Sequence, residues 1–449
     1  MDVKSAQPLL EKLLLLARKR HAVSAESVWC STHSSSFAVC DDDLEKSRTA
    51  VISRVGLRVL DSANRQGVAS LGEFDDDAVS LLCDMAFKNA EYSVPESDVV
   101  FVQHQPAPSL FDLGIYDSDL AVWSAQKQID LCLEMSCRAR SFDKRIKKVR
   151  ASEVETFSGE SLTLNSYGVS VYSRSTAGSA GLTLIAEDDG AAEIGGAVND
   201  GRSLSSLTAC LPVEEAVERT VRMLHGTPLP SGRYTLVLEP SVAAEFVSVL
   251  SELFSAENVC KGLTLLNGKM GQSVASEVLT LVDDGRLYGG LGTAACDSEC
   301  VETRRTTVVD HGRLSAWLCN LQYGRRLGLP STGNGSRGLS SLPEVDVNNF
   351  FVLPGVRSAE DIIASHDGCF CVTELMGLHT ADTVTGDFSL AARGLYYKDG
   401  IIAPVSSVTI AGNLTEFLKK IIEVGGDLRF FGRFGGCTMV VDDIAVAGK

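Results

Sequence analysis

The sequence lacks an excess of basic residues. Its 449 residues contain 41 lysines and arginines against 58 aspartates and glutamates, a formal net charge of -17. Proteins that bind nucleic acid draw much of their affinity from phosphate contacts, so this balance argues against DNA or RNA as a partner. The short basic runs at residues 18–20 and 144–148 are interpreted as solvated faces.

Long apolar runs are also missing. The leucine run at residues 13–16 has charged residues on both sides and is far shorter than a membrane span, and its flanks do not follow the order of a signal peptide. The 13 cysteines are an odd number scattered over a long chain, which indicates reduced thiols. We therefore expect a cytoplasmic protein that does not bind membranes.

Familiar catalytic motifs are absent from the sequence. It holds no phosphate-binding loop of the G-x-x-x-x-G-K type, no G-x-S-x-G elbow, no C-x-x-C pair and no H-E-x-x-H helix. Gly333–Gly338 spells G-x-G-x-x-G, but neither a buried strand nor a helix flanks it, so a plain glycine loop is predicted. Cys296 and Cys300 are interpreted as part of a charged loop, with a redox pair as the less favoured alternative.

One segment does bring metal-binding residue types close together in sequence. Thiolates and imidazoles in combination suit zinc. Apolar residues alternate between them, however, which favours Cys369 and Cys371 as packing residues on one face of a strand. The members of this cluster are His366, Cys369, Cys371, Glu374, His379 and Asp382.

The order of apolar patterns predicts an α+β fold, because strand-like runs cluster instead of alternating regularly with helices. We expect an N-terminal helix and strand domain at 1–105, a helix with a β-meander at 106–229, and a glycine- and strand-rich domain at 230–449. The meander is predicted as short strands. In the last region, a helix follows Pro240, and another begins after Asn413 and runs through Ile421 and Ile422 to a stop at Gly425.

Several segments of the C-terminal half resemble motifs of the TldD/PmbA family, also described as modulators of DNA gyrase. The resemblance is strongest from about Tyr234 to the end and is weaker before it. The motifs that carry it are Met270–Ser276, Val282–Asp284, Gly289–Gly292, Thr303–Thr306, Gly377–Ser389, Thr409–Leu414 and Gly426–Phe430.

The resemblance implies a fold and a role. In this family, TldD-like chains carry a zinc-binding H-E-x-x-x-H helix, and PmbA chains, also called TldE, lack it. Here the corresponding helix begins at Pro240 and places Ser248 and Leu253 approximately where the histidines would stand. Neither can replace an imidazole on zinc. Cys437 is given no ligand role, and the gyrase label fits poorly with the net charge of -17.

The chain is thus expected to be a non-catalytic PmbA/TldE-like subunit that works with a TldD-like metallopeptidase on unfolded or modified peptides. No catalytic residue, metal or cofactor is predicted, and the chain alone is expected to form a homodimer. The resemblance suggests His379, Thr380 and Asp387 as residues near a peptide chamber. The alternatives are a stand-alone metallopeptidase built on residues 366–382 and a self-associating peptide-binding module.

Overall fold

The computed structural model describes residues 2–107 and 112–449, without the side chain of His379. In the first half, the helices are α1 (Val3–Lys19), α2 (Asp76–Glu91), α3 (Ser118–Ala121), α4 (Ala125–Phe142), α5 (Leu204–Thr208) and α6 (Val213–Val221). The strands are β1 (Ser24–Cys40), β2 (Asp43–Leu60), β3 (Gln66–Leu71), β4 (Ile146–Asn165), β5 (Ser170–Asp188) and β6 (Ala191–Gly201).

These strands form one antiparallel sheet in the order β3-β2-β1-β4-β5-β6. The sheet therefore runs through both of the regions expected at 1–105 and 106–229. The short strands predicted for the meander are parts of longer ones, since β5 alone has 19 residues and continues through a run of small residues, many of them serines. Small polar residues satisfy the ladder as well as apolar ones do, but they leave no hydrophobic alternation to detect.

Helices cover one face of this sheet. Leu10 and Leu13 of α1 and Leu82 of α2 pack with Trp29 and Leu57 of the sheet. Further along the strands, α4 and α6 pack on the same face over residues such as Phe37, Val154 and Leu182. Because side chains alternate along a strand, the opposite face of the sheet carries a different set of residues and faces the rest of the molecule.

The second half contains the helices α7 (Pro240–Ser251), η1 (Glu252–Phe254), α8 (Ala256–Lys261), α9 (Leu321–Leu327), α10 (Ala359–Ser365), η2 (Leu378–Thr380) and α11 (Leu414–Lys419). Its longer strands are β7 (Gly232–Leu238), β8 (Leu281–Asp284), β9 (Arg305–Asp310), β14 (Cys369–Met376), β15 (Asp387–Lys398), β16 (Ile401–Asn413), β17 (Ile421–Val424) and β20 (Met439–Ala447). Shorter strands are β10 (Arg313–Leu314), β11 (Gly335–Ser336), β12 (Glu344–Val345), β13 (Phe350–Val352), β18 (Arg429–Phe431) and β19 (Phe434–Gly436).

These elements build two six-stranded sheets around one core and a small two-stranded sheet of β11 and β12. One has the order β10-β9-β8-β13-β19-β18, and the other has the order β16-β15-β14-β7-β20-β17. A further pairing of β16 with β20 closes the second sheet into a ring. The core of this region includes Phe246 of α7, whose ring stacks on Phe417 at 4.5 Å between centroids and meets Phe388 edge-on.

The predicted helix after Asn413 is shorter than expected. Asn413 caps it as predicted, with its side chain accepting from the Thr415 N–H, but α11 ends at Lys419. Ile421 and Ile422 belong to β17, which pairs with β20, so the prediction was wrong for these two residues. Consecutive β-branched residues fit a strand better than the end of a helix.

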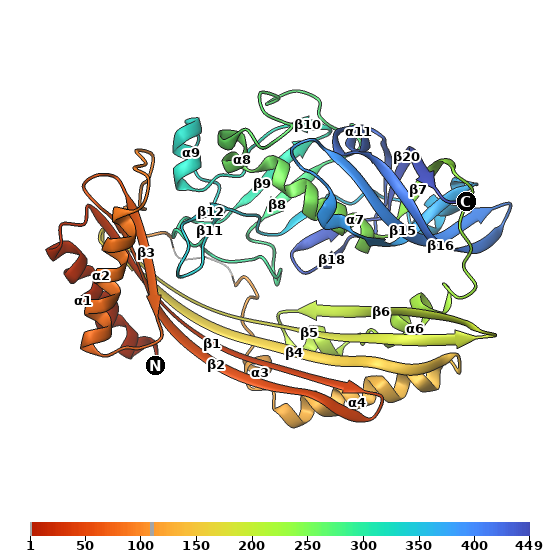
Figure 1. Cartoon of the computed structure of the whole chain (residues 1–449), viewed down its shortest axis with the longest axis horizontal. Coiled ribbons are helices and arrows are strands. Elements are labelled where there is room, and N and C mark those ends of the chain that lie inside the picture. Colours follow the sequence, from red (N-terminus) through yellow and green to blue (C-terminus); the bar gives the residue numbers. More distant parts are fainter. Residues whose placement is uncertain (1, 108–111) are drawn as a thin grey trace.

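The first sheet and the C-terminal region lie as two layers that face each other (Figure 1). The helices α1 and α2 lie at one end of the layered body, and α4 lies along the outer side of the sheet. None of the helices within residues 2–107 and 112–449 combines the length and apolarity that crossing a membrane requires.

Candidate functional site

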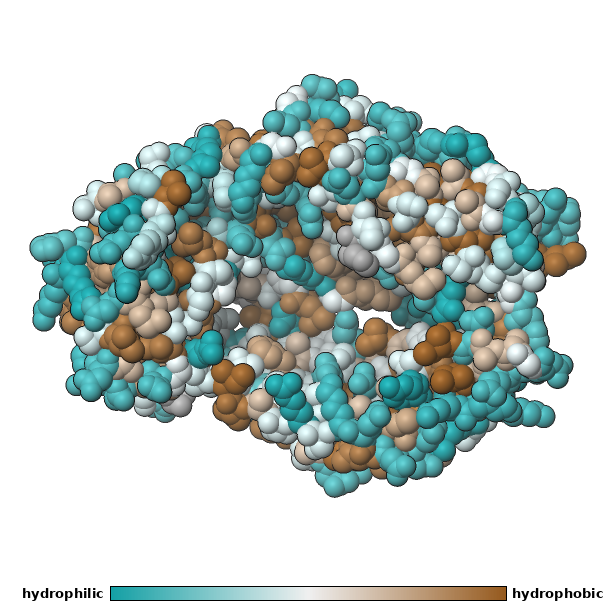
Figure 2. All heavy atoms as spheres, in the orientation of Figure 1, coloured by the Kyte–Doolittle hydropathy of each residue, from teal (hydrophilic) through white to brown (hydrophobic). Residues whose placement is uncertain are grey.

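A groove separates the uncovered face of the first sheet from two loops of the C-terminal region, residues 291–300 and 334–348. We call these two segments the roof loops. The groove contains a recess of about 440 Å³ at one end and another of about 570 Å³ further along the strands. A space-filling view shows openings between the two layers (Figure 2).

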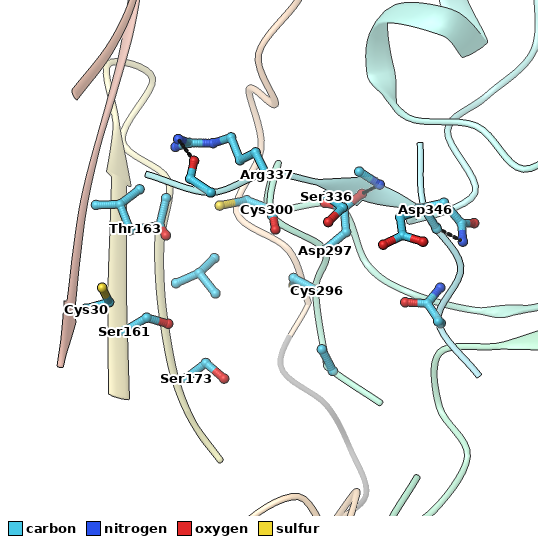
Figure 3. Close-up of a pocket in the computed structure, with 18 of the residues that line it drawn as sticks. Cys30, Ser161, Thr163, Ser173, Cys296, Asp297, Cys300, Ser336, Arg337 and Asp346 are labelled. Atoms are coloured by element: carbon cyan, nitrogen blue, oxygen red, sulfur yellow. Dashed lines mark hydrogen bonds between the residues drawn. The ribbon is translucent and has the colours of Figure 1, made fainter. Parts of the chain in front are cut away.

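The floor of the groove consists mostly of small side chains. The strand registers place these residues on the same, uncovered face of β1, β4 and β5. Hydroxyl groups can both donate and accept hydrogen bonds, and small side chains leave room for an extended chain above the sheet. Figure 3 shows several of them pointing toward the roof. The floor residues are Cys30, Thr32, Ser34, Ser36, Gly159, Ser161, Thr163, Ser173, Ser175, Ala177 and Ser179.

One border of the floor carries charged groups from β2. Lys46 forms an ion pair with Glu155 of β4 at 3.2 Å, and the Ser36 hydroxyl donates to the same carboxylate at 2.6 Å. The hydrogen bond from Ser36, with a further one from Lys46, lowers the pKa of Glu155. Glu155 is therefore ionised, and its carboxylate already interacts with Lys46 and Ser36.

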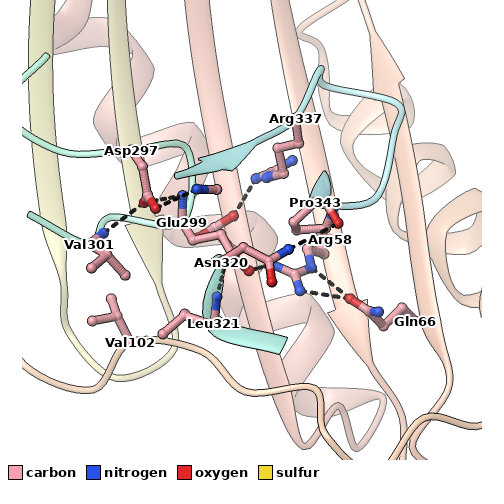
Figure 4. Close-up of polar contacts among 12 residues, drawn as sticks. Arg58, Gln66, Val102, Asp297, Glu299, Val301, Asn320, Leu321, Arg337 and Pro343 are labelled. Atoms are coloured by element: carbon pink, nitrogen blue, oxygen red, sulfur yellow. Dashed lines mark hydrogen bonds and ion pairs between the residues drawn. The ribbon is translucent and has the colours of Figure 1, made fainter. Parts of the chain in front are cut away.

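The Asp297 side chain accepts hydrogen bonds from the backbone of both roof loops. Asp297 accepts hydrogen bonds from the backbone N–H groups of Glu299 and Val301, both at 2.9 Å, and of Gly335 at 2.8 Å. Removal from water, together with the neighbouring Glu299 charge, raises the pKa of Asp297 to about 7. Asp297 thus joins the two roof loops to each other (Figures 3 and 4).

A buried group of charges joins the first sheet to the roof. Arg58 of β2 lies 3.4 Å from Glu299 and donates two hydrogen bonds to Gln66, while Arg337 forms an ion pair with Glu26 of β1. These four charged side chains are at most 3% exposed. Burial lowers the pKa of Arg58 and raises that of Glu299. We call Glu26, Arg58, Glu299 and Arg337 the clamp (Figure 4).

Arg202, which follows β6, makes a second connection between floor and roof. Its guanidinium donates to the backbone oxygens of Thr176 at 3.1 Å, Gly290 at 3.2 Å and Leu291 at 2.5 Å. Burial lowers the pKa of Arg202. With the Thr293 carbonyl at 3.4 Å, four carbonyls from two layers therefore converge on one side chain.

The helix α7 occupies the place where the family resemblance implies a zinc ligand helix. The Ser248 hydroxyl donates to the Glu245 carbonyl at 2.7 Å, and Leu253 is fully buried in the core beyond the helix end. Neither residue presents a ligand to a metal ion, so the residues at this position do not fit zinc.

Acidic and basic side chains surround a recess of about 220 Å³ beside α7. Partial desolvation raises the pKa of the exposed Glu245 to about 7, and the nearby charge of Glu374 contributes. Glu374 is paired with Arg393 at 2.6 Å, and Arg393 also contacts Glu193 of β6 at 3.0 Å. The recess is therefore lined by a network of ion pairs that connects the two layers.

The described side chains of the candidate metal cluster at residues 366–382 do not come together as a metal site, and the two cysteines are packing residues as predicted. Cys369 and Cys371 are buried in a small apolar core, and His366 contacts Glu423 at 3.2 Å. Asp382 accepts from the Val384 and Thr385 backbone in a turn. Within the described part of the chain, no group of three histidine, cysteine, aspartate or glutamate side chains could hold a metal ion. The His379 side chain lies outside the described residues.

The residues predicted near a peptide chamber lie at the start of β15 and in η2. Thr380 is exposed and donates to the Gly377 carbonyl at 2.8 Å, and Asp387 is exposed and accepts from Asn413 at 2.9 Å. The backbone of His379 lies in η2, directly before Thr380. Neither Thr380 nor Asp387 is among the residues that line the groove.

The charged loop expected around Cys296 is largely buried. Glu299 is fully buried in the clamp, and burial raises the pKa of both thiols, that of Cys296 to about 11. At neutral pH both are therefore weak nucleophiles. Gly333–Gly338 forms a roof loop with the short strand β11, and no helix follows it, as predicted.

The sequence reasoning missed the clamp and Arg202. Part of the clamp could have been predicted from the sequence, because Glu26 and Arg58 are charged residues inside otherwise apolar strand segments. They stand opposite each other in the β1–β2 register. Such charges inside a strand need partners from elsewhere in the fold.

Comparison with known proteins adds to this picture. The family model for the PmbA/TldA metallopeptidase C-terminal domain matches residues 231–448, and the model for the central domain of the same family matches residues 118–224. The metalloprotease PmbA of Escherichia coli O157:H7 is 27% identical over 391 residues, which are 86% of this chain and 84% of the relative. A metalloprotease of Methanothermobacter thermautotrophicus is 33% identical over 233 residues, 50% of this chain and 51% of the relative.

Solved structures share the whole fold. The crystal structure of TldE from Thermococcus kodakarensis has a TM-score of 0.86 at 23% identity and covers 98% of this chain and 100% of its own. A Thermotoga maritima protein described as a candidate modulator of a DNA gyrase has a TM-score of 0.89 at 24% identity, with the same coverage. With two family models that together match most of its length, this chain belongs to the PmbA/TldD metallopeptidase family.

Proposed function

We propose that this chain is a non-catalytic subunit of the PmbA/TldE type, which forms one wall of a peptide-holding chamber together with a TldD-like metallopeptidase. One observation carries the proposal: where the family resemblance implies zinc ligands, α7 offers a hydroxyl bonded to its own helix and the following η1 offers a buried leucine. The hydroxyl-lined groove supports a role in holding extended peptide.

Metal content and activity test this proposal together. After dialysis, the purified chain should contain no stoichiometric zinc by elemental mass spectrometry, and it should not cleave unfolded peptides alone. Addition of a TldD-like subunit should yield a complex on size-exclusion chromatography and peptidase activity that exceeds that of either subunit. Metal-dependent cleavage by this chain alone would overturn the proposal.

A stand-alone metallopeptidase built on residues 366–382 is the alternative. Its test is the His379→Ala variant: loss of both zinc and activity would support this alternative, and unchanged metal content would oppose it. Size-exclusion chromatography of the chain alone also tests the predicted homodimer, and a self-associating binding module would bind peptide without any peptidase partner.

A further inference from the structure

We propose that acidic extended peptides pair with the free edge of β2 at the border of the groove, and that Arg48 and Arg54 of β2 recognise two carboxylates six residues apart in such a peptide. This inference rests on the proposed function, because it names the class of peptide that the chamber holds. Its evidence is the strand register, the free charges on one border of the groove, and the unpaired edge of β2.

Arg48 and Arg54 share the uncovered face of the first sheet. Arg48 stands opposite Ser36 in the β1–β2 register, and Arg54 stands opposite Cys30. Directly opposite residues of an antiparallel pair point to the same side of the sheet. Arg48 lines the larger recess, and the positive charge of Arg54 acts on the Cys30 thiol, which lines the smaller one.

These two guanidinium groups are available to a ligand. Both residues are exposed, and within residues 2–107 and 112–449 neither forms an ion pair or a side-chain hydrogen bond. Their neighbour Lys46 differs, because it is paired with Glu155. Across the groove, Asp200 is occupied by the Gly432 N–H at 2.8 Å. The free charge on this border is therefore positive, although the chain as a whole carries -17.

The acidic remainder of the chain does not cancel this local charge. Interactions between exposed charges are screened beyond about 8 Å at physiological ionic strength. A carboxylate that contacts a guanidinium directly can form a bidentate pair with it, whereas distant surface carboxylates act only weakly. Contacts at Arg48 and Arg54 thus decide which side chains are favoured at this border.

The edge of β2 explains why the ligand is an extended chain. β3 pairs with β2 only from Val55 onward, so Asp43–Arg54 has one neighbour strand, β1, and one unpaired edge. An extended peptide can add to such an edge through backbone hydrogen bonds. Val51 and Ile52 on this segment are 62% and 52% exposed, which offers apolar contact on both faces.

The spacing of the two arginines sets the spacing of the carboxylates. Six residues along a strand span about 20 Å, and an even separation keeps both side chains on one face. A peptide that pairs with β2 has the same rise per residue. Glutamates at positions i and i+6 of the peptide therefore match Arg48 and Arg54, whereas glutamates at i and i+3 point to opposite faces.

Fluorescence anisotropy with labelled 12-residue peptides tests the proposal on the full chain. Three peptides share a serine and threonine background: one with Glu at i and i+6, one with Gln at both positions, and one with Glu at i and i+3. We expect the i, i+6 peptide to bind about fivefold more tightly than the Gln peptide at low salt, and this advantage should shrink as salt is added. The i, i+3 peptide should lose most of the advantage.

Variants assign the effect to these arginines. The double variant Arg48→Gln/Arg54→Gln should bind all three peptides equally, with the affinity that the native chain has for the Gln peptide. The matched control Arg18→Gln/Lys19→Gln removes the same charge from the end of α1, on the covered side of the sheet, and should keep the preference for the i, i+6 peptide.

Equal binding of the Glu and Gln peptides by the native chain would overturn this inference while leaving the proposed function in place. Failure of every peptide to bind, alone or with a TldD-like subunit, would instead count against the proposed function itself.

Discussion

At the scale of single residues, the groove depends on buried charged side chains. The clamp holds two arginines and two glutamates, all nearly inaccessible, between the first sheet and the roof. A buried ion pair adds little net stability compared with an apolar pair, but removal of one partner leaves an uncompensated charge. The clamp therefore matters most for what happens when one of its members is lost.

Replacement of Arg58 tests this balance. The Arg58→Met variant should lower the free energy of unfolding by about 3–5 kcal/mol, because Glu299 and Glu26 would then share a single arginine. In Arg58→Met/Glu299→Gln, the excess charge is gone and the glutamine oxygen can still accept from the Leu321 N–H, so at least half of the loss should be recovered. Urea denaturation measures both variants.

The exposed pair between Lys12 and Asp76 provides the control for this cycle. The Lys12→Met variant should change the unfolding free energy by about 1 kcal/mol or less, since both partners are in contact with water. A double variant as unstable as Arg58→Met would contradict the charge argument and would instead indicate that lost packing dominates.

Asp297 should make stability depend on pH. Its folded-state pKa is raised to about 7 from an ordinary value near 4, so the folded state binds the proton more tightly than the unfolded state does. The contribution is fully present below pH 4 and is lost as the pH rises through 7. Asp283 is shifted the same way by burial. Thermal unfolding should therefore occur at a higher temperature at pH 5.5 than at pH 8.

The Asp297→Asn variant isolates the contribution of this residue. It should flatten the fall in stability between pH 5.5 and pH 8, and it should lower stability at pH 5.5 by about 1 kcal/mol because one backbone N–H loses its acceptor. Glu155, whose pKa is lowered, provides the comparison, since Glu155→Gln should leave the slope above pH 5.5 unchanged. A slope that is the same in the native chain and in Asp297→Asn would contradict the assignment.

At the scale of elements, α7 lies unusually close to β19. A Cβ atom on Gly436 would come within 2.2 Å of the Pro240 carbonyl oxygen and 2.5 Å of the Ala244 nitrogen. These are backbone atoms of the first turns of α7, which cannot rotate away as a side chain can. The position of α7 over the sheet thus depends on the absence of a side chain at residue 436.

The Gly436→Ala variant should consequently displace α7 and lower the unfolding free energy by about 1–3 kcal/mol. Urea denaturation measures the loss. Gly72→Ala is the control, because a Cβ there would meet only the Ser53 carbonyl oxygen at 3.7 Å, an ordinary contact. If both variants unfolded alike, the close approach of α7 and β19 would not be what positions the helix.

The same scale shows what the sequence could predict. The proline at the start of α7 predicted that helix, and Asn413 predicted the start of α11, because local signals determine both. The long strand β4 was predicted only as short strands of the meander, since the residues that face the groove are small and polar. The clamp was not predictable, because Arg58 and Glu299 lie 241 positions apart in the sequence.

At the scale of the whole molecule, two layers are joined at separate places and leave the groove between them. The clamp acts at one end of the sheet, and the pairs of Arg393 with Glu193 and Glu374 act near β6. Arg202 lies between these contacts and reaches the roof from the floor side. Other ion pairs, such as that of Arg429 with Glu215, also join the first half of the chain to the C-terminal region, so the groove is bordered by contacts at several separate places.

Loss of Arg202 should loosen the roof without unfolding the chain. In Arg202→Gln, the carbonyls of Gly290 and Leu291 lose a shared donor, so amide hydrogen exchange in residues 287–294 should become about tenfold faster, while exchange in α4 stays unchanged. Arg174→Gln is the matched control on β5: Arg174 stacks on Tyr116 at 3.9 Å and makes no hydrogen bond to the roof within the described residues. If amide exchange in the roof were as slow in Arg202→Gln as in the native chain, the clamp and Asp297 would be sufficient to keep the roof ordered. Faster exchange confined to the roof would show that the layers move relative to each other around the clamp, and a peptide that lies along β2 should then bind more weakly, because it would have to order the roof as it binds.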